Sequence, residues 1–282
     1  MNGEDDPRAL RSASALRAFT LYARWYFWRN FHAVRLSRGG RPLVPADRAV
    51  IVCTNHPGWW DPLLFILLQD ALFPDRFGYG PMDEAALEKY GFFRRLGIFG
   101  VELDSRRGAA RFLAVSSRIL ADPRAMLWIT AEGHFTDPRQ RPVRLRPGIA
   151  HLARRNPGVA ILPLAIEYTF WNERHPEALF RFGPVLEAGG EARVSDWVAR
   201  LETALTQAMD ALAHDSMTRD PALFEPILSG RAGVGGVYDL WRRARAFAAG
   251  QRFDPSHEGA SQPKPASHAA HRGAGRCQGR DA

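Results

Sequence analysis

Lysine is nearly absent from this chain of 282 residues, in which only Lys89 and Lys264 carry an ammonium group. The formal net charge is nevertheless +8, so the basic excess is arginine. A basic surface attracts phosphate, whether in nucleic acid or in anionic lipid headgroups. Composition alone does not separate these partners, and an arginine bias can also reflect genome composition.

Cysteine is also scarce, with Cys53 in an apolar run and Cys277 in a polar stretch near the end. Two cysteines so far apart exclude a disulfide framework and a cysteine-based zinc site, and they fit a reducing cytoplasm. His134 and His151 lack the spacing of metal ligands, so we expect no metal.

Long apolar runs and two common catalytic patterns are missing as well. No stretch reaches the roughly 18 uninterrupted apolar residues of a spanning helix, and residues 1–11 do not look like a secretory signal. The sequence has neither the Gly-x-Ser-x-Gly of serine hydrolases nor the Gly-x-Gly-x-x-Gly of dinucleotide sites. We therefore expect neither of those two chemistries.

The segment 13–36 predicts a helix with an unusual surface, because apolar and aromatic residues recur at helical spacing. Its aromatic and basic residues include Phe19, Tyr22, Trp25, Tyr26, Trp28, Arg17, Arg24, Arg29 and Arg35. Amphipathic helices rich in Arg and Trp favour the membrane interface. We expect this helix to bind the cytoplasmic face of a membrane peripherally; packing of its aromatic face on the core is the alternative.

Short apolar runs alternate with helical patterns from about residue 44 onward. Strands are predicted at 48–55, 76–81, 98–104, 125–133, 159–168 and 179–186, and helices at 61–72, 83–91, 109–121, 147–156 and 195–215, the last capped by Ser195. Strands separated by helices imply an α/β fold with a mostly parallel sheet flanked by helices.

Composition also suggests four segments along the chain. Residues 1–40 hold the interfacial helix, 41–215 a single domain and 216–252 a helical C-terminal extension. Beyond these, Pro, Ser, His, Gly and Ala replace large apolar residues, so 253–282 is predicted to be disordered.

His56 and Asp61 form the most informative local pattern. His56 follows a predicted strand, and Asp61 begins the next predicted helix. A carboxylate at one ring nitrogen fixes the tautomer and leaves the other nitrogen as a base, which can take a proton from an alcohol. Alternatively, Asp61 is simply the N-cap before Pro62. Spacing alone leaves both interpretations open.

Residues from about 48 to 168 resemble the glycerolipid acyltransferase family, which includes the bacterial 1-acylglycerol-3-phosphate acyltransferases. The matching blocks, in the family's order, are Asn-His-x-x-x-x-Asp at 55–61, the Gly-containing segment 96–108, Glu-Gly at 132–133, the segment 144–153, and the strand 161–168 with Pro163. The resemblance implies an O-acyltransferase that needs no cofactor. It would move a fatty acyl group from acyl-CoA or acyl carrier protein to a lipid hydroxyl, with His56 as general base oriented by Asp61.

The resemblance also implies a set of substrate-binding residues. They are Asn55, Arg106, Arg107, Glu132, Gly133 and Arg144. Two departures matter, since Asp104 falls near the place of a family arginine and Phe135 stands where the family has another. In the family these arginines are associated with the acceptor phosphate. The acceptor expected here is therefore a glycolipid, a lysophospholipid or a related lipid alcohol rather than plain 1-acylglycerol-3-phosphate. We interpret Glu132 as a positioning residue.

Two other functions remain open. A lipid esterase or thioesterase could use the same His–Asp pair with water as acceptor, and a non-catalytic protein could bind anionic lipid through its basic surface. The expected partners are membrane lipids and the acyl donor, not nucleic acid. The sequence does not set the oligomeric state.

Overall fold

The computed structural model describes residues 6–232 and 245. The strands are β1 (Ala33–Ser37), β2 (Val50–Thr54), β3 (Phe77–Asp83), β4 (Ile98–Val101), β5 (Ala125–Thr130), β6 (Ala160–Thr169), β7 (Glu177–Phe182), β8 (Leu186–Glu187) and β9 (Phe224–Ser229). They form one sheet in the order β4-β3-β5-β2-β6-β7-β1-β9, with β8 paired to β6. The predicted α/β fold with a mostly parallel sheet is confirmed, because only β7, β8 and β9 introduce antiparallel pairs.

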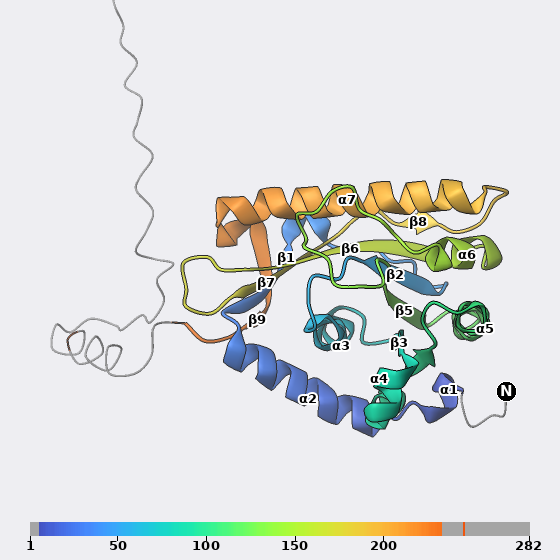
Figure 1. Cartoon of the computed structure of the whole chain (residues 1–282). Helices are drawn as coiled ribbons and strands as arrows, with labels where there is room; N and C mark the ends of the chain where they lie inside the picture. Colours follow the sequence, from blue (N-terminus) through green and yellow to red (C-terminus); the bar gives the residue numbers. More distant parts are fainter. Residues whose placement is uncertain (1–5, 233–244, 246–282) are drawn as a thin grey trace, which may run out of the picture.

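Helices cover both faces of this sheet (Figure 1). They are α1 (Pro7–Leu10), α2 (Ala13–Asn30), α3 (Asp61–Leu72), α4 (Glu84–Lys89), α5 (Arg106–Leu120), α6 (Gly148–Arg155) and α7 (Val194–Thr218), with 3-10 turns η2 (Arg38–Gly40), η3 (Gly91–Leu96) and η4 (Pro221–Leu223). Helices α6 and α7 pack on one face, and α2 and α3 lie on the other. The result is a three-layer sandwich.

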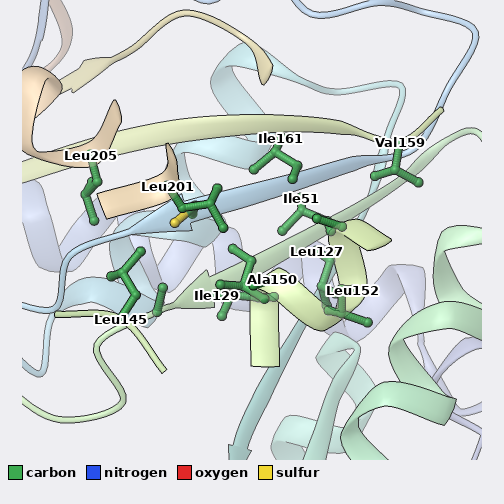
Figure 2. Packing of buried hydrophobic residues seen from close by; sticks show 14 of the residues in the cluster. Ile51, Leu127, Ile129, Leu145, Ala150, Leu152, Val159, Ile161, Leu201 and Leu205 are labelled. Atoms are coloured by element: carbon green, nitrogen blue, oxygen red, sulfur yellow. The ribbon is translucent and has the colours of Figure 1, made fainter. Parts of the chain in front are cut away.

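The central strand β2 contributes to two separate hydrophobic cores, because its side chains alternate between the faces of the sheet. Ile51 and Cys53 lie in one core, and Val50 and Val52 lie in the other. Figure 2 shows the first core, where strand residues such as Ile51 meet side chains of α6 and α7. β2 is therefore buried on both faces, which explains its uninterrupted apolar sequence.

Strand β2 is parallel to both of its neighbours, β5 and β6, with Thr54 in register with Thr130 and Leu164. All three strands therefore run toward the same edge of the sheet. In open α/β sheets, ligands bind outside the carboxyl ends of the strands. The loops after β2 and β5 carry the predicted site residues to this edge.

The predicted helix over 13–36 is wrong in its last residues. Helix α2 ends at Asn30, and Ala33–Ser37 form strand β1, parallel to β7 and antiparallel to β9. Arg35 is consequently not an interfacial residue, because its guanidinium is buried against Glu177 at 2.9 Å. The pairing strands lie far along the sequence, so tertiary contacts override the local helical pattern.

The predicted helical extension over 216–252 also needs correction. Phe224–Ser229 form strand β9 at the edge of the main sheet. Because β1 and β9 belong to this sheet, the proposed segment boundaries at 40 and 215 do not separate independent units. Helix α7 begins after Arg193 as N-cap rather than after Ser195. The predicted disordered tail, 253–282, lies outside the described residues.

Candidate active site

His56 lies directly beyond the end of β2, with its side chain 16% exposed. Its Nδ1 is 2.6 Å from Oδ2 of Asp61, the first residue of α3. An ionised carboxylate can only accept, so Nδ1 donates and Nε2 is left with a lone pair. The predicted pairing of these two side chains is present, with the tautomer that a general base requires.

Asp61 does not cap the helix, contrary to the alternative interpretation. The residue at the cap position is Trp60, and the Asp61 side chain is fully buried. Besides His56, its carboxylate accepts from the hydroxyl of Tyr168 at 2.7 Å and from the backbone N–H of Gly58 at 3.3 Å. A buried charge needs such donors to offset its desolvation. The geometry therefore favours orientation of the imidazole over capping.

Asn55 extends the β2–β6 pairing beyond the last strand residue. Its side chain is fully buried, donates to the carbonyl of Ile166 at 2.9 Å, and accepts from the Ile166 N–H at the same distance. The side-chain amide of Asn55 thus makes the pair of hydrogen bonds with β6 that the backbone of a neighbouring strand residue would make. Asn55 fixes the start of the His56 loop and points into the sheet, so its predicted substrate contact stays a prediction.

Glu132 follows β5 and holds the backbone of the same loop. Its Oε2 accepts the backbone N–H of His56 at 2.8 Å. Burial raises the pKa of Glu132 above its ordinary value, although the His56 N–H and the charge of nearby His134 act in the opposite direction. This hydrogen bond joins the ends of β2 and β5, as expected for a positioning residue.

Gly133 adopts a left-handed backbone conformation with φ of 74°. A Cβ atom there would lie 2.4 Å from Nε of Arg146, so the arginine side chain crosses directly over this glycine. Arg146 in turn forms a 2.8 Å ion pair with Asp104. The sequence drew attention to Arg144, but Arg146 is the cation beside the Glu132–Gly133 turn.

The other predicted arginines do not converge on His56. Arg144 is exposed and lies 3.7 Å from Glu202 of α7. Arg106 and Arg107 are exposed in the first turn of α5, and neither guanidinium has a hydrogen-bond or ion-pair partner within residues 6–232. A phosphate role for any of them stays a prediction.

Aromatic rings and one leucine gather on the outer side of α2, and the rings continue onto η3. The exposed members, which we call the α2–η3 surface, are Leu21, Tyr22, Trp25, Trp28, Tyr90 and Phe92. The half-buried Phe19 links the two elements, with 5.6 Å between its ring centroid and that of Tyr22 and 5.9 Å to that of Phe92. Within the described part of the chain, no helix is long and apolar enough to cross a bilayer.

The family model described as Acyltransferase matches residues 35–167, which run from β1 to the end of β6 and include His56, Asp61 and Glu132. Residues 35–167 therefore form an enzyme domain of the acyltransferase family. A search of curated proteins gave no match.

A solved structure with a similar fold is the 1-acyl-sn-glycerophosphate (LPA) acyltransferase PlsC from Thermotoga maritima. The TM-score is 0.52 at 17% sequence identity, and the match covers 70% of this chain and 79% of that one. At this identity the likeness shows the fold alone.

Tyr168 contacts the predicted His56–Asp61 pair, a role that its position in the sequence does not indicate. It ends the matched strand block 161–168, but nothing in its spacing connects it to Asp61, from which it is separated by 107 residues. Within the described residues, no three His, Cys, Asp or Glu side chains cluster as metal ligands.

Proposed function

We propose that this enzyme transfers a fatty acyl group from a thioester donor to the hydroxyl of a lipid acceptor. The observation that supports this proposal most directly is the 2.6 Å contact between His56 Nδ1 and the fully buried Asp61 carboxylate, at the open end of a parallel sheet. The donor is acyl-CoA or acyl carrier protein, and the acceptor is a lysophospholipid, a glycolipid or a related lipid alcohol.

His56 acts as the general base in this proposal. Nε2 removes the proton of the acceptor hydroxyl while the oxygen attacks the thioester carbon. Asp61 keeps Nδ1–H in place and stabilises the imidazolium that forms. As the tetrahedral intermediate collapses, the carbon–sulfur bond breaks and the imidazolium returns the proton to the thiolate. The products are a lipid ester and a free thiol.

The loop after His56 offers few donors for the developing oxyanion. Pro57 has no N–H, and the N–H of Gly58 already points to Asp61 at 3.3 Å. Oxyanion stabilisation requires donors that are free in the ground state. The two amides directly after His56 are therefore poor candidates for this role.

Peripheral binding at the cytoplasmic face of a membrane is part of the same proposal. The α2–η3 surface combines exposed rings with the exposed cations Arg17, Arg24 and Arg29 of α2 and Lys89 near η3. Aromatic rings favour headgroup depth, and cations are attracted to anionic lipid. A lipid acceptor would then be drawn from the bilayer rather than from water.

Product analysis with a labelled acyl donor tests the function. The purified enzyme is incubated with labelled acyl-CoA or acyl carrier protein, lipid alcohols and vesicles, and the labelled products are separated. We expect a new lipid ester. Labelled free acid as the main product would instead identify a thioesterase. A protein that binds lipid but turns over neither donor would support the non-catalytic alternative.

A further inference from the structure

A tyrosine from the end of β6 reaches the side of Asp61 that faces away from His56. The Tyr168 hydroxyl lies 2.7 Å from Oδ1 of Asp61, whereas His56 Nδ1 lies 2.6 Å from Oδ2. Each carboxylate oxygen therefore has its own strong side-chain donor. The two donors come from different elements, the loop after β2 and the strand β6.

The Tyr168 phenol stays protonated and can only serve as donor toward this carboxylate. Burial, followed by the charge of Asp61, raises the pKa of Tyr168 well above its ordinary value. A neutral phenol beside an ionised carboxylate donates its proton in the hydrogen bond. The direction of this contact is therefore set at every pH at which the enzyme would work.

The ring of Tyr168 is held in place by aromatic neighbours. Trp60 packs against it edge-on, with 5.2 Å between ring centroids, and Phe31 lies at 5.9 Å. The indole N–H of Trp60 donates to the hydroxyl of Tyr26 at 3.1 Å, which ties this cluster to α2. A phenol that packs against two other rings is a rigid reference point for Asp61.

His56 and the N–H of Gly58 both donate to Oδ2, and donors on one oxygen alone do not fix an aspartate side chain, because the terminal carboxylate torsion is broad. A donor on the opposite oxygen removes this freedom. We propose that Tyr168 is a positioning residue that locks the Asp61 carboxylate, so that Oδ2 stays aimed at Nδ1 of His56. This inference rests on the proposed general-base role of His56.

The hydrogen bond from Tyr168 also affects the negative charge of Asp61. A hydrogen bond donated to a carboxylate stabilises and disperses its charge, which leaves less of it to stabilise the imidazolium. Removing the hydroxyl therefore has two consequences. First, His56 is oriented less well, so kcat falls. Second, the undispersed charge of Asp61 stabilises the His56 imidazolium more strongly, so the acidic limb of the kcat/KM profile moves to higher pH.

The test compares Tyr168→Phe with Tyr79→Phe, which removes a phenol hydroxyl from β3, outside the site. For Tyr168→Phe we expect kcat to fall about ten- to a hundredfold, while KM for donor and acceptor stays nearly unchanged. The acidic limb of its kcat/KM profile should move to higher pH. Tyr79→Phe should keep wild-type kinetics. Tm is measured for both variants to detect unfolding. A loss of kcat caused by unfolding alone would leave the pH profile of the folded fraction unchanged.

Asp61→Asn and His56→Ala separate this inference from the proposed function. If Tyr168 acts through Asp61, adding Tyr168→Phe to Asp61→Asn costs little beyond Asp61→Asn alone. Wild-type kcat and pH profile in Tyr168→Phe, or fully additive losses in the double variant, would overturn the positioning role while leaving the His56 mechanism intact. Full turnover by His56→Ala would overturn both.

Discussion

The phenyl ring of Phe135 lies against the imidazole of His56, with 4.4 Å between the ring centroids and 52° between the ring planes. Phe135 is itself 60% exposed, so its ring forms part of the surface next to the candidate base. A guanidinium at this position would give two directed donors and a positive charge, and a phenyl ring gives neither. The side of the site next to His56 is therefore apolar.

This apolar side leads to a prediction about the acceptor. We expect a glycolipid or neutral lysolipid alcohol to be acylated in preference to lysophosphatidic acid in a competition assay with one donor. Phe135→Arg should raise the share of lysophosphatidic acid about tenfold, because charge-assisted hydrogen bonds contribute about 1.5–3 kcal/mol. Leu223→Arg adds the same charge on η4 and should change nothing. Dominant use of lysophosphatidic acid by the wild type, lost in Arg106→Ala, would contradict the prediction.

His56→Ala should abolish transfer while the protein stays folded. General-base catalysis contributes on the order of 100- to 10,000-fold, and turnover should fall by this amount. His151→Ala, a change on α6 outside the site, is the matched control and should retain activity. Circular dichroism and Tm establish that both variants are folded. Near-wild-type turnover in folded His56→Ala would be incompatible with the mechanism.

Glu132→Gln should keep most of the activity, because an amide oxygen can still accept the His56 N–H. The raised pKa also predicts how stability depends on pH. The folded protein holds the Glu132 proton more tightly than the unfolded chain, so the stability from this group is present below its ordinary pKa of 4.5 and is lost as pH rises through the folded value. The Tm of Glu132→Gln minus the Tm of the wild type should therefore be larger at pH 7 than at pH 4.5. A large loss of turnover would instead point to proton transfer by Glu132.

The α2–η3 surface should bind anionic vesicles. Trp25→Ala combined with Phe92→Ala should weaken flotation more than tenfold, since burial of one large apolar side chain contributes about 1.5–3 kcal/mol. Met217→Ala, at a still more exposed apolar position at the end of α7, is the control. Point substitutions are needed because deletion of 1–36 would remove most of strand β1. Unchanged flotation of the double variant would place membrane contact elsewhere.

Cys53 should remain a thiol and take no part in transfer. Burial raises its pKa to about 12, so almost no thiolate is present in the folded protein. Iodoacetamide at pH 9 should leave the Cys53 peptide unmodified in the native protein and alkylate it in urea, as measured by mass spectrometry. Rapid native alkylation, or an acyl group trapped on Cys53, would contradict this expectation.

The sequence alone was sufficient to predict the structure wherever the decisive interactions are local. Four residues separate His56 from Asp61 and connect the end of a strand to the start of a helix, so a short loop brings the two side chains together. The helix 61–72 was predicted with its correct bounds, because Pro62 in the first turn and a continuous apolar run describe a buried helix. The order of strands and helices gave the parallel sheet in the same way.

The tertiary structure decided what depends on distant partners. Residues 33–37 form a strand only because β7 and β9 supply the hydrogen bonds, and Arg35 is paired with a carboxylate 142 residues away. Tyr168 reaches Asp61 because β6 lies beside β2 in the sheet, a neighbourhood that no spacing along the chain encodes. Arg146 rather than Arg144 crosses Gly133, because the backbone N–H of Arg146 donates to the carbonyl of Ala131 at 2.8 Å and so places residue 146 beside this turn. Periodicity reports which face of an element is buried, but only the packed sheet determines which residues meet there.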